Sequence, residues 1–264
     1  MPTAWATAWR TWQMTRRAYP WTYAVGTVLP AALTIALAYL GFHVIGGGAD
    51  FAAGSGTTAY LAYIVVGTTA FHFAVRLILW SAKALITEQR QGTLGALLIA
   101  PAGRLPYLLG FTGFAVLSSV LEFLTLGLVV AVLGITVPVS SVPGALLGAL
   151  ALVAAVFALS VGLGGLMIAA GEAHISQNTV FIVLGLVGGF TFPRDYLPEP
   201  ARWFAELLPT TSAMDVLHGS FTGGQSLPAL LPRLAVCAAL SCAYLFLGLR
   251  YLPRAEARAV ERTY

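Results

Sequence analysis

The chain has 264 residues, of which 58% are hydrophobic and 9% are charged, and its formal net charge is +4. Soluble globular domains carry about 25% charged residues, so these charges are too few to cover a water-facing surface. The composition excludes an ordinary soluble domain and predicts a polytopic membrane protein, whose basic residues mark the ends of apolar spans rather than a nucleic-acid surface.

Residues 1–20 precede the first apolar run and carry three tryptophans on one helical face. Trp5, Trp9 and Trp12 are spaced i, i+4 and i+7, while Arg10 lies away from that stripe. Tryptophan favours the headgroup level of a bilayer, and arginine favours its anionic inner surface. The pattern predicts an interfacial helix on the inner leaflet; a poorly ordered tail with chance spacing is the alternative.

Six apolar runs follow that meet the requirement of roughly 20 residues for a membrane-spanning helix, the fifth being the shortest. They cover residues 21–45, 58–81, 105–134, 144–170, 175–191 and 228–252. No internal repeat or linker divides them. We therefore expect one all-α membrane protein with six transmembrane helices, forming a single domain over residues 21–252, and a cytoplasmic tail at 253–264.

The distribution of lysine and arginine sets the orientation of these spans, because cytoplasmic segments are enriched in both. With the N-terminus inside, ten basic residues fall on the cytoplasmic side and three on or near the outer side. The ten are Arg10, Arg16, Arg17, Lys83, Arg90, Arg104, Arg250, Arg254, Arg258 and Arg262, and the three are Arg194, Arg202 and Arg233. Both termini are therefore predicted to be cytoplasmic.

The stretch between the second and third spans, TEQRQGTLGALLIAPAGR at 87–104, predicts a separate short helix. Gly92 breaks the helix that comes from the second span, the Thr93 hydroxyl can cap a new one, and Pro101 ends it. The apolar face of this helix consists of Leu94, Leu97 and Leu98. Such a helix at the inner surface can press on a partner protein, or it can simply stabilise the loop.

The stretch between the fifth and sixth spans, residues 190–219, is too polar and too rich in proline to cross a membrane. Pro198 precedes a short helical pattern that carries Trp203 on its apolar side. Irregular backbone at membrane depth is tolerated only where protein or water satisfies it. We therefore predict a re-entrant helical hairpin in the outer leaflet.

Both stretches resemble motifs of one family. E-x-R-x-G-T-L at 88–94, followed by A-P-x-x-R, is similar to the cytoplasmic signature of ABC-2 type permeases. F-P-x-x-Y-L-P at 192–198, followed by L-L-P-T-T, is similar to the outer motif of that family. The order of the motifs, the span count and the N-terminal helix agree, so the resemblance covers nearly the whole chain.

The resemblance implies the membrane subunit of an ATP-binding-cassette exporter, of the drug-export branch linked to antibiotic resistance, in a bacterial cell membrane. Such a chain pairs with a second copy of itself or with a homologous permease. Two cytoplasmic ABC ATPase subunits bind ATP and Mg, while this chain contacts membrane lipids and binds no cofactor, metal or nucleic acid.

The resemblance also assigns residues to two places. The residues implied in ATPase coupling are Glu88, Arg90, Gly92, Thr93, Leu94, Leu97, Leu98 and Pro101. Family members usually carry an acidic residue where this chain has Gly95, so docking is expected but a salt bridge from that position is not. The residues implied in an outer gate are Pro193, Leu197, Pro198, Trp203 and Pro209.

The sequence carries no ATPase motif of its own. Its one lysine, Lys83, is not preceded by the glycines of G-x-x-x-x-G-K-[ST]. The sequence also lacks H-E-x-x-H, paired-cysteine and G-x-S-x-G motifs. We therefore expect a transporter subunit rather than an enzyme.

Glu122 is the one acidic residue deep in a predicted span, and Arg76 lies inside another. Counting about 1.5 Å per residue, Glu122 lies about 25 Å from the cytoplasmic end of its span and Arg76 about 9 Å from that of its own. This difference in depth predicts that the two do not pair. Glu122 either contacts a polar or cationic group of the cargo, or it bonds to neighbouring Ser and Thr such as Ser118 and Ser119 or is neutralised by protonation. His72 is a second candidate for the cargo path, with core packing as the alternative.

The small number of charges in the spans favours an amphipathic cargo of drug or lipid type, taken from the cytoplasm or the inner leaflet. A polysaccharide or glycolipid exporter of the same family is the second hypothesis; its channel would be lined with aromatic residues. A stand-alone secondary transporter or channel is the third, but it would gain nothing from the helix after Gly92.

Overall fold

The computed structural model describes residues 2–18, 20–45, 60–99, 104–171, 174–191, 193 and 196–261, and all regular secondary structure in these ranges is helical. The expectation of an all-α protein is thereby confirmed. The helices are α1 (Pro2–Ala18), α2 (Pro20–Ile45), α4 (Tyr60–Arg90), α5 (Leu94–Ile99), α6 (Arg104–Val132), α7 (Val142–Ala170), α8 (His174–Val187), α9 (Glu199–Glu206), α10 (Pro209–Phe221) and α11 (Leu227–Glu261).

Four stretches within the described residues are long and apolar enough to cross a membrane. They are Tyr60–Arg90, Leu105–Val132, Val142–Ala170 and Leu227–Arg258. The apolar stretches found in α2 and α8 are shorter. At about 1.5 Å per residue, α8 is about 21 Å long, less than the roughly 30 Å of a hydrocarbon core. The structure thus supports a multi-pass membrane protein, while the six-span layout stays a prediction.

The helix boundaries follow from local sequence signals. The side chain of Ser141 accepts a hydrogen bond from the backbone N–H of Gly144 and so caps the start of α7. Gly171, with φ of 70°, ends the same helix in the left-handed conformation that glycine adopts at low cost. At the end of α8, Gly189 has the same φ, which helps to explain why this helix is short.

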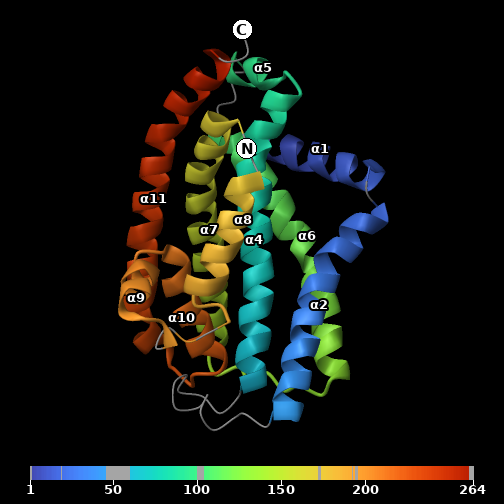
Figure 1. Ribbon diagram of the computed structural model, residues 1–264, viewed down its shortest axis with the longest axis vertical. Coiled ribbons are helices and arrows are strands. Elements are labelled where there is room, and N and C mark those ends of the chain that lie inside the picture. The colour runs from blue at the N-terminus through green and yellow to red at the C-terminus, as the bar shows by residue number, and fades with distance from the viewer. Residues whose placement is uncertain are drawn as a thin grey trace.

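The core of the bundle is built around α4, which contacts α2, α6, α7, α8 and α10 (Figure 1). Close helix packing depends on small residues. A Cβ at Gly248 of α11 would lie 2.9 Å from the backbone nitrogen of Gly162 on α7. The two long helices can therefore touch along their backbones, as small residues allow in membrane bundles.

The first helix crosses the outside of α6 rather than joining the bundle (Figure 1). A Cβ at Gly110 of α6 would lie 2.5 Å from the carbonyl oxygen of Ala4, so the crossing requires glycine there. Trp5 and Trp9 are exposed, and their rings stack with centroids 6.5 Å apart. The helix and its tryptophan face are as predicted from the sequence; its contact with a membrane surface stays a prediction.

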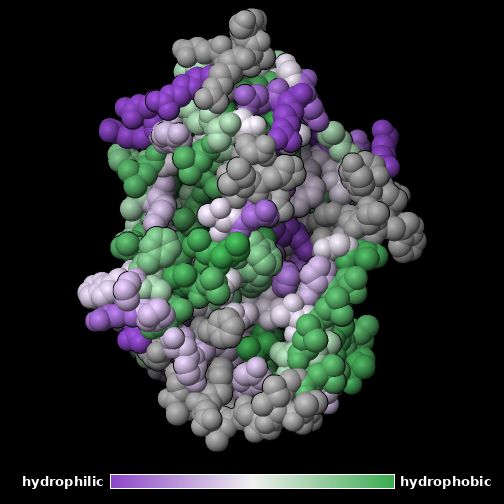
Figure 2. Space-filling view, viewed as in Figure 1, coloured by the Kyte–Doolittle hydropathy of each residue, from purple (hydrophilic) through white to green (hydrophobic). Residues whose placement is uncertain are grey.

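The two ends of the molecule differ. α5 lies at the same end as the C-terminal part of α11, whereas α9 and α10 lie toward the opposite end (Figure 1). Hydrophobic side chains cover α2 and much of the middle of the visible face, and hydrophilic ones gather near α5 (Figure 2). This arrangement places the two predicted motifs at opposite ends of an apolar band.

Candidate functional site

The turn between α4 and α5 has the break that the sequence predicts. α4 ends at Arg90, and Gly92 takes a left-handed φ of 71°. Leu94, the first residue of α5, is buried against α4 and α6 in a cluster that includes Leu108. The apolar side of α5 therefore packs partly on this chain itself, and Leu97 packs against the same cluster. The side chain of Leu98 and all of Pro101 lie outside what the structure describes.

The other side of α5 is open. Ile99 is 87% exposed, and a Cβ at Gly95 would meet nothing within 4 Å. Arg90 is exposed at the end of α4. The exposed surface available to a partner at this turn is thus formed by Gly95 and Ile99 rather than by the face of Leu94.

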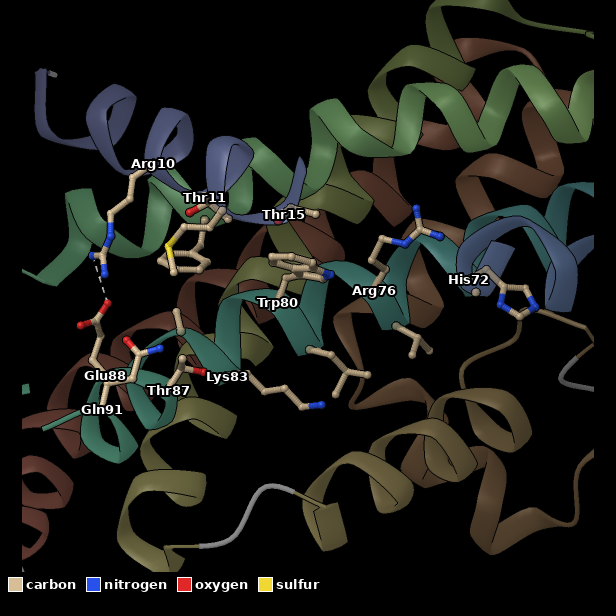
Figure 3. A pocket seen from close by; sticks show the side chains of 16 residues that line it. Arg10, Thr11, Thr15, His72, Arg76, Trp80, Lys83, Thr87, Glu88 and Gln91 are labelled. Atoms are coloured by element: carbon tan, nitrogen blue, oxygen red, sulfur yellow. Dashed lines mark hydrogen bonds and ion pairs between the residues drawn. The ribbon is translucent and has the colours of Figure 1, made fainter. Parts of the chain in front are cut away.

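Glu88 joins three segments that are far apart in the sequence. Its carboxylate accepts a hydrogen bond from Arg10 Nη1 at 3.2 Å (Figure 3), from the Tyr107 hydroxyl at 2.8 Å, and from the Thr93 hydroxyl. The Glu88 side chain is only 6% exposed, so a charged acceptor is buried with its donors in place. The prediction that the Thr93 hydroxyl caps α5 is corrected, since this hydroxyl donates back to Glu88 and stabilises the turn.

Arg76 and Glu122 form an ion pair, contrary to the prediction from their depths. Arg76 Nη1 lies 2.8 Å from Glu122 Oε2, and the side chains are 8% and 1% exposed. Ser118 and Ser119 donate to the carbonyl of Ala115 instead of to the carboxylate. The serine alternative for Glu122 is therefore wrong.

The depth estimate failed because α4 continues past the predicted end of the second span. Measured from Arg90, Arg76 lies about 21 Å along its helix, and Glu122 lies about 27 Å from the start of α6, at about 1.5 Å per residue. The two residues thus differ in depth by only about 6 Å, which two long side chains can bridge. A hydrogen bond of 2.7 Å between the hydroxyls of Ser81 and Thr112 fixes the same antiparallel register between these helices.

A cavity of about 750 Å³ lies between α1, α2, α4 and α6. Its wall along α4 follows one helical face with spacings of three and four residues. That face carries His72, Arg76, Trp80, Lys83, Thr87 and Gln91. Figure 3 shows these side chains together with those of α1, and Trp80 lies between the two helices. His72 thus lines the cavity, whereas Glu122 is not among the lining residues and is joined to the cavity wall by its ion pair with Arg76.

The outer motif forms two short helices. Pro198 precedes α9 and Pro209 is the first residue of α10, as expected for prolines at helix starts. Pro193 and Pro209 are buried, Leu197 is half-buried, and Pro198 and Trp203 are exposed. The structure therefore does not gather these five residues into one cluster.

The outer segment is held to the bundle by close backbone contact and by charge. A Cβ at Gly67 of α4 would lie 1.7 Å from the carbonyl oxygen of Phe190, so this crossing also requires glycine. Arg233 of α11 pairs with Glu206 at 3.2 Å and with Asp215 at 3.4 Å. These contacts connect α9 and α10 to α11.

Comparison with known families decides what this arrangement is. The model of the ABC-2 type transporter family matches residues 3–222, which run from α1 through the end of α10. The chain belongs to the ABC-2 type transporter family. No curated protein matches the chain.

Membership in the ABC-2 type transporter family makes this chain a transmembrane component of a transporter. The matched range includes both motifs, with Glu88 and Gly92 in one and Pro193 and Pro209 in the other. It also includes α1, so the contact between Arg10 and Glu88 lies within the family domain.

Sequence reasoning missed two residues of the site in this ABC-2 type transporter. Tyr107 opens the third span and carries a hydroxyl that an otherwise apolar stretch does not need, which was the available signal. Arg10 was assigned only to the membrane surface. Its contact with Glu88 depends on how α1 folds back along α6, which periodicity within one segment does not reveal.

Proposed function

We propose that this chain is the membrane subunit of an ABC exporter that moves an amphipathic cargo with ATP hydrolysed by separate subunits. The observation that carries the proposal is the Glu88 cluster. It connects the exposed turn before α5 with α1, α4 and α6, which together form most of the cavity wall.

The cluster gives a mechanical route from a partner to the cavity. A partner that pushes on the exposed surface of α5 displaces Thr93, whose hydroxyl is bonded to Glu88. Glu88 and Arg10 themselves line the cavity. A small displacement of the segment between α4 and α5 therefore changes the cavity wall directly. The displacement does not need to be transmitted through lipid-facing residues.

The composition of the cavity supports an amphipathic cargo more than a polysaccharide. Within the part of the chain that the structure describes, its lining has two aromatic side chains, Trp80 and Phe111, beside apolar residues such as Leu79. Its volume lies in the range of about 300–1,000 Å³ that small-molecule sites occupy.

The proposal also includes the pairing of this chain with a second permease.

Co-purification with an ABC ATPase subunit from the same source tests the partnership. The chain is expected to retain the ATPase, and Ile99→Asp on the exposed side of α5 is expected to release it. Glu199→Gln on α9 is the control. Leu150→Asp on α7 is unsuitable as a control, because Leu150 is an exposed residue of the apolar band. If no ATPase binds and cargo movement ignores ATP, the proposal fails.

A further inference from the structure

A second cavity, of about 480 Å³, lies between α4, α7, α8 and α11, the helices that Figure 1 labels on one side of the bundle. Its lining is apolar apart from the side chains of Thr179, Tyr244 and Tyr251. Among the described residues, it shares no lining residue with the larger cavity between α1, α2, α4 and α6. The smaller cavity is therefore a separate site, and its ligand need not be the transported cargo.

This cavity is a groove that follows one face of each long helix. On α7 its wall runs from Leu159 to Leu166, and on α11 it runs from Tyr244 to Tyr251. In both helices the lining residues are spaced i, i+3, i+4 and i+7. Each wall is about 10 Å long at about 1.5 Å per residue. The shape and the lining suit a hydrocarbon chain that lies along the helices.

Two glycines leave space inside the groove. A Cβ at Gly248 of α11 would lie 2.9 Å from the backbone nitrogen of Gly162 on α7, so the two backbones approach closely there. A Cβ at Gly162 would itself meet nothing within 4 Å, and Gly162 lines the groove. The space over Gly162 is therefore available to a ligand.

The groove is accessible from the hydrocarbon region of the bilayer. Leu166 and Leu247, one from each wall, are 54% and 63% exposed. Both residues lie in helices that are long and apolar enough to cross a membrane. A lipid chain can therefore enter the groove sideways, without crossing a polar surface.

The face of α11 that lines the groove continues to two arginines. Arg254 and Arg258 follow Tyr251 at i+3 and i+7, and both are exposed. Hydrophilic side chains gather over this part of α11 (Figure 2), which lies at the same end of the molecule as α5. Basic residues at the end of a span attract anionic lipid headgroups. The groove thus combines an apolar wall with positive charge beyond one of its ends.

We propose that this groove binds one chain of a membrane lipid whose anionic headgroup lies against Arg254 and Arg258. The apolar walls require a hydrocarbon chain, and the two guanidinium groups select a negative head. Such a lipid would fill the space between α8 and α11. Because the two cavities are separate, the lipid site does not depend on the proposed transport function.

Native mass spectrometry of the purified full chain tests the site, with phosphatidylglycerol and phosphatidylcholine of identical acyl chains as the two probes. The chain should retain one phosphatidylglycerol at least about tenfold more tightly than phosphatidylcholine, because two arginines favour the anionic head. Glycerol 3-phosphate, which has a phosphate but no acyl chain, should not compete. Equal retention of the two lipids, or competition by glycerol 3-phosphate, overturns the proposal.

Gly162→Leu tests whether the lipid chain lies in the groove. The new side chain would occupy the space over Gly162 and should weaken phosphatidylglycerol binding about tenfold, because several methylene groups lose their apolar contacts. Gly127→Leu is the matched control, since Gly127 is an exposed glycine of α6 where a Cβ also meets nothing within 4 Å. Equal affinity in the two variants contradicts the groove as the binding site.

Variants of α11 locate the headgroup. Arg254→Gln and Arg258→Gln should each weaken phosphatidylglycerol binding about fivefold and leave phosphatidylcholine binding unchanged. Arg250→Gln is the control, because the Arg250 guanidinium lies 5.0 Å from the centroid of the Phe246 ring, on another side of α11. Equal losses in Arg250→Gln and Arg254→Gln would contradict the assigned head position.

A second copy of the chain is the other occupant that the same spectra detect. If a second copy covered the groove, Gly162→Leu would convert dimers to monomers and leave the amount of phosphatidylglycerol per chain unchanged. That result would overturn the lipid site. The measurement involves neither an ATPase nor transport, so failure of the proposed function and failure of the lipid site give different results.

Discussion

Arg76 of α4 and Glu122 of α6 are joined by an ion pair of 2.8 Å between two largely apolar helices. The pair lies beside the cavity, with Arg76 in its wall and Glu122 behind. A buried charge is costly in a membrane interior unless it is paired, so each residue explains the presence of the other.

Removal of one partner should destabilise the protein more than removal of both. Glu122→Gln leaves Arg76 buried without its counter-charge, which costs about 3–5 kcal/mol in soluble proteins, whereas replacement of a whole pair by apolar residues is often neutral. Thermal unfolding in detergent should therefore show a lower midpoint for Glu122→Gln and recovery in Arg76→Met with Glu122→Leu. A double variant that is less stable than Glu122→Gln would contradict the pairing.

Two glycines on α6 provide a matched test of whether α1 packs against α6 as the structure shows. Gly110→Ala places a Cβ 2.5 Å from the Ala4 carbonyl oxygen and 2.6 Å from Thr7 Cβ, so α1 must move away. Gly113→Ala meets nothing within 4 Å and should be neutral or stabilise the helix by up to about 1 kcal/mol. Hydrogen exchange of the α1 amides should accelerate in the first variant only. Equal exchange in both would show that α1 does not rest on Gly110.

The segment after α8 should depend on Gly67 in the same way as α1 depends on Gly110. A Cβ there would overlap the Phe190 carbonyl oxygen, since the two would be 1.7 Å apart, and backbone on both sides leaves little room to adjust. Gly67→Ala should therefore release the segment after α8 and increase proteolysis near Phe190. Gly26→Ala on α2, where a Cβ meets nothing within 4 Å, is the control. Unchanged cleavage in Gly67→Ala would mean that the contact is not maintained in solution.

The sequence predicted what local patterns encode. The break at Gly92, the short helix after it, the N-terminal helix with exposed Trp5 and Trp9, and the proline before α9 all follow from residue types at fixed spacings. The family resemblance also proved right.

Interhelical contacts were not predictable in the same way. The pairing of Arg76 with Glu122 depends on where α4 ends, and hydropathy ended that span too early because the last turns of α4 become polar. The roles of Thr93 and Tyr107 depend on the position of Glu88 between two helices. The pattern of residue types within one helix does not determine how that helix is aligned along its neighbour.

The direct test of the account is the coupling between ATP hydrolysis and cargo movement in a complex reconstituted with its ATPase. Glu88→Gln keeps an acceptor for Tyr107 and Thr93 but loses the charge that holds Arg10. Glu199→Gln, at an exposed position of α9, controls for loss of a carboxylate elsewhere. The account predicts that Glu88→Gln retains basal hydrolysis but moves several-fold less cargo per ATP than Glu199→Gln; equal cargo per ATP in the two variants would contradict it.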